Sequence, residues 1–176
     1  MPVARRQKRE TVIPPIKRRS NKTMIQWADL FCDTVRAAGL EARVIKRVNG
    51  WPETTILAGK QCYTKSITYR LDRRLYFQGV DPKKLEESGD YVLLCGGIHD
   101  QLRDIFLIPW GLFFQAIRNG KAINTYKPPK EYWQYKFKIQ STDNGWFIIV
   151  QGSGKQKIDV TRWHFDVKGA IQNLSQ

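Results

Sequence analysis

The sequence predicts a mixed α/β fold in which helices flank a β-sheet, and three observations favour it. Two segments, 24–38 and 110–119, have the apolar spacing of amphipathic helices. The continuous apolar run 90–96 has the length of a strand that is buried on both faces. Asn-Gly pairs at 49–50 and 144–145 are strong hairpin signals between short extended segments. With 176 residues, 41% of them hydrophobic, the chain is expected to form one globular domain.

A basic arm, residues 1–22, is expected to precede this domain, which would then span 23–176. The arm holds eight Lys and Arg residues, among them Arg18 and Arg19, against the single acid Glu10, and so supplies half of the net charge of +14. We expect it to be disordered and to bind phosphates. A tail that only aids solubility and a nuclear-localisation signal are the alternatives.

The charge of the whole chain points to a polyanionic partner. Thirty Lys and Arg against sixteen acids favour nucleic acid, with an anionic membrane surface second. The three cysteines have no metal-ligand spacing and there are only two histidines, which argues against a zinc site or a disulfide framework. The longest apolar run, 105–114, is broken by Pro and Gly and is too short to span a bilayer. Because no signal peptide is evident, we expect an intracellular protein without a membrane partner, in the cytoplasm or nucleoid, or in the nucleus of a eukaryote.

The first element expected is the helix 24–38. Asn21 or Thr23 would cap it and Gly39 would end it. Asp29 and Asp33 are four residues apart, so they share one face. That face is normally a solvated one, but either carboxylate could lean over a metal site.

Extended segments are expected next. A strand at 41–48 ends at the Asn-Gly turn, and the segments 54–57 and 61–68 form a hairpin around Gly59, which permits the positive φ that a tight turn needs. Residues 75–79 would form a further extended piece or a loop.

The middle of the chain is expected to alternate between helix and strand. Asp81 and Pro82 have the residue types of an N-cap and a first helical position, so a short helix would run to Gly89. Strands at 90–96 and 104–108 would follow, joined by a turn over 96–103, and then the helix 110–119.

The last third, 121–176, is expected to be a β-rich extension. A loop at 121–130 leads to the segment 132–139, in which aromatic and basic residues alternate. Further strands are expected at 146–151 and 157–160, and a final helix at 162–174 capped by Thr161. The extension could carry recognition, extend the sheet or form a partner surface.

Two residues within this order of elements are the candidate catalytic residues. Glu53 opens the segment after Trp51-Pro52, and Lys65 ends the triplet Tyr63-Thr64-Lys65 on the next segment. Together with the order of elements over 24–120, this resembles the PD-(D/E)xK nuclease superfamily, whose core is a mixed sheet flanked by helices. In that family an acid opens the second core strand and an acid-x-Lys triplet lies on the third. The sequence departs from the family at Tyr63, which stands in place of the second metal-binding carboxylate.

The resemblance implies a metal-dependent DNA endonuclease of restriction or repair type, acting on duplex DNA and commonly as a homodimer. Glu53 would hold Mg²⁺ with a helper acid, for which Asp33, Asp29 or Asp72 are the candidates, and Lys65 would stabilise charge on the phosphate. The adjoining phosphates would be bound by the arginines Arg70, Arg73 and Arg74.

Two alternatives follow from the same residues. The phenol of Tyr63 is a poor ligand for a hard cation, so the chain could be an inactive DNA- or RNA-binding subunit of a larger assembly. Alternatively, the aromatic residues of 132–139 could stack on single-stranded bases, with Lys127, Lys130 and Lys136 beside them. Alternating aromatic residues on a strand are more often half of a core.

Overall fold

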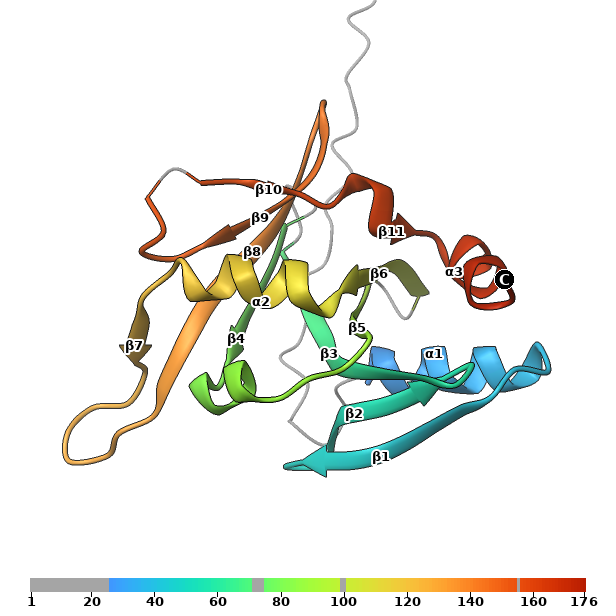
Figure 1. Cartoon of the computed structure of the whole chain (residues 1–176), viewed down its shortest axis with the longest axis horizontal. Helices are drawn as coiled ribbons and strands as arrows, with labels where there is room; N and C mark the ends of the chain where they lie inside the picture. The colour runs from blue at the N-terminus through green and yellow to red at the C-terminus, as the bar shows by residue number, and fades with distance from the viewer. Residues whose placement is uncertain (1–25, 71–74, 99–100, 155) are drawn as a thin grey trace, which may run out of the picture.

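The computed structural model describes residues 26–70, 75–98, 101–154 and 156–176 (Figure 1). This part of the chain forms three α-helices and two β-sheets, and more of it lies in strands than in helices. The expected mixture of helices and strands is therefore confirmed at the level of fold class. The basic arm predicted for residues 1–22, with Arg18 and Arg19, lies outside the described residues.

The first sheet is mixed and contains most of the N-terminal strands. Its order is β1 (Ala42–Val48), β2 (Trp51–Leu57), β3 (Lys60–Arg70), β5 (Tyr91–Ile98), β6 (Gln101–Pro109) and β11 (His164–Phe165). β3 and β5 are parallel, and every other pair in this sheet is antiparallel. The one parallel pair requires a long crossover, and the described part of this connection is residues 75–90.

The second sheet is antiparallel and shares β3 with the first. Residues Cys62–Ile67 of β3 pair with β5, whereas Thr68–Arg70 pair with β4 (Leu75–Val80). β4 continues into β8 (Trp133–Thr142), β9 (Gly145–Val150) and β10 (Ile158–Asp159), and the short β7 (Ala122–Asn124) also pairs with β8. The predicted extension therefore joins the N-terminal strands through β4.

The helices cover opposite faces of the mixed sheet, as Figure 1 shows for α1 (Trp27–Ala37) and α2 (Trp110–Arg118). Alternate residues of β5 explain this: Val92 and Leu94 pack with α2, and Leu93 and Cys95 pack with α1 and α3 (Val167–Leu174). A strand that is apolar at every position can line two cores at once. The apolar run 90–96, which predicted a buried strand, is continuous because both faces of β5 pack in a hydrophobic core.

Two adjacent register shifts interrupt the pairing of β1 with β2, and the second is a bulge on β2. Arg47 pairs with Pro52 and Lys46 pairs with Thr54, so Glu53 is an extra residue on β2. Without the bulge, strict alternation would point Glu53 to the α1 face together with Thr55 and Leu57. The extra residue turns its side chain to the opposite face, as bulges next to functional sites commonly do.

Several predicted boundaries are wrong. The expected turn over 96–103 is occupied by the ends of β5 and β6, which continue to Ile98 and from Gln101. The expected loop 121–130 contains the strand β7, because the edge of β8 offers it a partner. Both differences arise from pairing between strands, which local residue preferences do not encode.

Two predicted helices also differ from the structure. The segment after Asp81 is a 3₁₀-helix, η2 (Pro82–Glu86), although Asp81 caps it as expected by accepting a hydrogen bond from the Lys83 amide at 2.9 Å. The last helix does not begin after Thr161 but at Val167, where Asp166 accepts from the Gly169 amide. Thr161 instead begins a short 3₁₀ turn, and its Oγ1 accepts from the Trp146 amide at 2.9 Å.

Candidate functional site

Glu53 is the acid around which the candidate site is built. Its Oε1 lies 2.8 Å from Lys84 Nζ, and its Oε2 lies 3.0 Å from Lys46 Nζ in an ion pair without hydrogen-bond geometry. Its side chain is 15% exposed. Burial works against the charge of Glu53, but the two lysines outweigh it and hold the pKa of the carboxyl below its ordinary value.

Lys84 is a charged residue held inside the protein. Its side chain is 5% exposed, and its ammonium group is shared between Glu53 and Glu87, with 2.8 Å to Glu87 Oε2. The capped η2 places it there. Burial works against its charge, but the two carboxylates more than compensate and raise its pKa. A buried lysine must be paired in this way to remain charged.

Lys65 and Tyr63 lie on β3 beside this ion pair. Lys65 Nζ is 5.7 Å and Lys84 Nζ is 5.5 Å from the centre of the Tyr63 ring, so both cations lie against the same aromatic side chain. The pKa of Lys65 is lowered to about 8, mainly by burial; the charges of Lys136 and Lys84 add to this effect, and those of Glu53 and Asp81 oppose it. The positive charge of Lys65 is compensated by acidic side chains less completely than that of Lys84.

β8 brings a fourth lysine to the same place. Lys136 Nζ donates to Gln134 Oε1 at 2.7 Å, and its charge acts on Lys65. Gly79 of β4 lies beneath this pair, since a Cβ atom there would be 2.7 Å from Gln134 Oε1 and 3.1 Å from Lys136 Nζ. We call Lys46, Lys65, Lys84 and Lys136 the lysine cluster. Its members come from β1, β3, η2 and β8: Lys46 and Lys84 form ion pairs with Glu53, and Lys65 lies near enough to both Glu53 and Lys136 to be affected by their charges.

The structure brings three of the predicted site residues together, namely Glu53, Lys65 and Lys136. The electrostatic effects of Glu53 and Lys136 on Lys65 place them in one neighbourhood. Lys127 and Lys130 are exposed on the loop between β7 and β8. Arg70 lies at the end of β3, where it pairs with Leu75 of β4. Arg73 and Arg74, like Asp72, lie outside the described residues.

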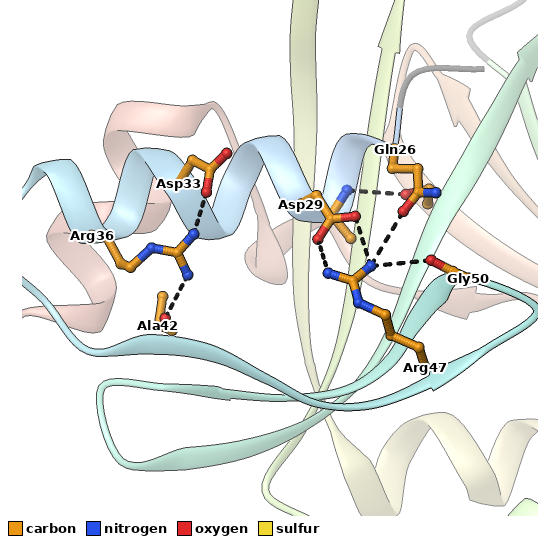
Figure 2. Close-up of polar contacts among 9 residues, drawn as sticks. Gln26, Asp29, Asp33, Arg36, Ala42, Arg47 and Gly50 are labelled. Carbon is orange, nitrogen blue, oxygen red and sulfur yellow. Dashed lines mark hydrogen bonds and ion pairs between the residues drawn. The ribbon is translucent and has the colours of Figure 1, made fainter. Parts of the chain in front are cut away.

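Asp33, the predicted metal ligand, does not join Glu53. Figure 2 shows that Asp33 forms an ion pair with Arg36, which also donates to the Ala42 carbonyl at 2.8 Å. Asp29, the other acid of α1, pairs with Arg47 at 2.6 Å (Figure 2). α1 covers the face of the sheet opposite to the one on which Glu53 and Tyr63 lie. Asp29 therefore links α1 to Arg47 of β1, whereas Asp33 pairs within α1 with Arg36, and it is Arg36 that reaches the start of β1.

The residues around Glu53 do not fit a Mg²⁺ ion. Mg²⁺ prefers several oxygen ligands, and no group of three or more His, Cys, Asp or Glu residues in the described part of the chain could hold a metal. Tyr63 is 3% exposed, and burial, with a smaller effect from Glu53, raises the pKa of its phenol, so that it stays neutral. Glu53 itself is already occupied by two lysines.

Lys46, Lys84 and Gln134 are site residues that sequence reasoning does not single out. Lys84 follows the Asp81-Pro82 helix start, and that signal could have indicated an ordered turn. Nothing local shows that the turn packs against β2. The bulge that redirects Glu53 has no sequence signature either, because it arises from the register between β1 and β2.

A second group with titratable side chains lies at the other end of the mixed sheet. His164 Nε2 is 2.7 Å from Asp104 Oδ1, and the imidazole ring packs on Trp146 and Phe106 with centroids 4.7 and 5.0 Å away. Asp104 and His164 border an open depression of about 410 Å³, which Arg103 and Lys168 also line. The pair joins β11 to β6, and the ring contacts indicate a structural role.

Comparisons of the chain with protein-family models, curated proteins and solved structures gave no match. Among the described residues, no helix has both the length and the apolar character needed to cross a membrane. What the protein does is therefore inferred from the residues of the site itself.

Proposed function

We propose that this protein binds nucleic acid and that the lysine cluster holds phosphate groups directly, without a metal ion. The observation that carries this proposal is the excess of positive charge around Glu53. Lys46 and Lys84 form ion pairs with Glu53, Lys65 lies near Glu53 and is affected by the charge of Lys136, and the charge of Lys65 is only partly compensated by acids. A phosphate would supply the missing negative charge and receive hydrogen bonds from ammonium groups.

The whole chain supports a nucleic acid over a small anion. Its net charge of +14 gives the protein a positive field that attracts polyanions and concentrates them at its surface. Exposed Lys127 and Lys130 lie on the loop that precedes β8, the strand that carries Lys136. A nucleic-acid backbone offers repeated phosphates to such separated lysines. Duplex DNA as the preferred form and a homodimer remain predictions.

A metal-dependent DNA endonuclease is the second candidate. It is favoured by Glu53 on the second strand and Lys65 on the third strand of a mixed sheet, which agrees with the arrangement expected from the resemblance to PD-(D/E)xK nucleases. The missing second carboxylate at Tyr63 and the lysines on Glu53 weigh against it. Hydrolysis through this site would need a further acid, and of the three candidate helper acids, Asp29, Asp33 and Asp72, only Asp72 lies outside the described residues.

The two candidates are separated by one pair of assays. We expect the purified protein to bind a labelled 20-base-pair duplex in EDTA, and Lys65→Ala and Lys136→Ala each to weaken binding by roughly three- to tenfold. Lys168→Ala, which removes the same charge from α3, is the matched control and should change affinity by less than about twofold. Plasmid cleavage in Mg²⁺ that disappears in Lys65→Ala would favour the endonuclease instead.

A further inference from the structure

Three aromatic side chains are unusually exposed next to the lysine cluster. Tyr126, Tyr132 and Trp133 are 55%, 39% and 48% exposed, whereas the other highly exposed large apolar residues in the described chain lie on α1 and β1. They lie within eight residues on the β7–β8 loop and the start of β8. We call these three residues the aromatic platform.

The loop that carries the aromatic platform is hydrogen-bonded at its base. Asn124 Oδ1 accepts from the amides of Tyr126 at 3.2 Å and Tyr132 at 2.9 Å. The amide and hydroxyl of Thr125 both donate to the Tyr132 carbonyl at 2.9 Å. The Tyr126 and Tyr132 rings lie 5.5 Å apart with a 43° tilt. Two rings held before a ligand arrives lose little conformational entropy on binding.

The aromatic platform and the lysine cluster share β8. Trp133 begins the strand, and Lys136 of the cluster follows three residues later, about 10 Å along the chain and, because side chains alternate, on the opposite face of the strand from Trp133. Tyr132 is close enough to Tyr63, beside Lys65, to act on its ionisation. Exposed Lys127 and Lys130 lie between Tyr126 and Tyr132 in the sequence, and Glu131 is the one acid in the segment 126–133.

We propose that the aromatic platform stacks on the bases of a single-stranded nucleic-acid segment whose phosphates lie on the lysine cluster. The inference rests on the proposed function and narrows it to a class of substrate. Every base has a flat π-face, so exposed rings beside cations bind single strands with little dependence on sequence. A base within a duplex is already stacked and hydrogen-bonded, so it does not offer its face to the rings.

The test compares strands that have bases with strands that have only the backbone. Labelled 20-nucleotide oligo(dT), oligo(rU), an abasic deoxyribose strand of equal length and a duplex would be titrated in EDTA. We expect Trp133→Ala and Tyr126→Ala each to weaken oligo(dT) binding by about five- to a hundredfold. Their affinities for the abasic strand and the duplex should stay within about twofold. A similar loss of affinity for oligo(rU) would show that the aromatic platform also binds RNA. A loss of affinity for only one of oligo(dT) and oligo(rU) would show that the platform prefers the sugar of that strand.

Conservative variants separate stacking from folding. Trp133→Phe and Tyr126→Phe retain a ring and should keep most of the oligo(dT) affinity. Equal losses of affinity for the abasic strand would contradict base stacking by the aromatic platform. Unchanged affinity for both oligo(dT) and oligo(rU) would also contradict it and would leave a protein partner as the occupant. If instead Lys65→Ala and Lys136→Ala bind the abasic strand as the wild type does, the lysine cluster itself is not a phosphate site.

Discussion

The pKa of a single residue, Lys65, reflects the burial and the charges of the candidate site. It lies on β3 beside Tyr63, and its nearby charges are Lys84, Lys136, Glu53 and Asp81. Burial lowers its pKa to about 8 because the ammonium group loses water that the acids only partly replace. A phosphate next to Lys65 would favour its charged form.

Binding should therefore depend on pH in a defined direction. As the pH rises through 8 the free protein loses the proton on Lys65, whereas the bound protein keeps it, so binding requires proton uptake and affinity falls. We expect binding to be roughly fivefold weaker at pH 9 than at pH 8. Anisotropy titrations of the duplex between pH 7 and 9.5 would measure this change.

Lys65→Arg is the control for that pH dependence. Arginine stays protonated throughout the range, so its affinity should remain flat between pH 7 and 9.5. A wild-type curve that is equally flat, or an identical fall in the variant, would show that Lys65 does not contact the phosphate.

At the scale of elements, the hairpin turns were predictable and the bulge was not. The turn at Asn49-Gly50 has positive φ at both residues, 52° and 82°, which is the geometry for which Asn-Gly is selected. Local chemistry also fixes the cap of η2 at Asp81. By contrast, the parallel pairing of β3 with β5 and the bulge at Glu53 depend on residues far apart in sequence.

The same distinction applies to the candidate site. Glu53 and Lys65 could be singled out because an acid and a lysine on adjacent strands suit phosphate chemistry. Lys136 could be predicted only as one of several basic residues on an aromatic strand. That Lys84 and Lys46 occupy the carboxylate of Glu53 could not be predicted, because it requires the positions of η2 and of the bulge.

Gly79 of β4 offers a test of how elements position the lysine cluster. A Cβ atom there would come within 2.7 Å of Gln134 Oε1, so Gly79→Ala must displace Gln134 and, with it, Lys136. Because both groups end flexible side chains, we expect the free energy of unfolding to change by less than about 1 kcal/mol. Duplex affinity should fall about two- to fivefold in the same titration.

Gly111→Ala is the matched control in α2. No atom lies within 4 Å of a Cβ at Gly111, so this variant should be about 0.5–1 kcal/mol more stable in urea unfolding and bind unchanged. Unaltered binding by Gly79→Ala would mean that the Lys136–Gln134 contact does not position a phosphate ligand.

At the scale of the whole molecule, the segments 24–120 and 121–176 share one hydrophobic core. Ile67 and Val92 from the first segment pack in the same cluster as Phe137 and Ile148 from the second. β3 also belongs to both sheets. The described parts of these two segments therefore pack against each other.

This shared core makes a clear prediction about truncation. We expect the full chain to unfold in a single transition by far- and near-ultraviolet circular dichroism. A fragment ending at residue 120 would expose the apolar side chains that face Phe137 and Ile148, and it should show no cooperative transition. A fragment that melts cooperatively would demonstrate an independent N-terminal domain.

The measurement that tests the central claim most directly is the effect of Glu53→Gln on duplex affinity in EDTA. If the lysine cluster binds phosphate directly, removal of the one central negative charge should strengthen binding about two- to tenfold. Asp143→Asn, which removes an equal charge from the β8–β9 turn, should have little effect, and thermal melting would confirm that Glu53→Gln remains folded. Weaker binding in Glu53→Gln would contradict the account, and wild-type binding that requires Mg²⁺ would contradict it by assigning Glu53 to a metal.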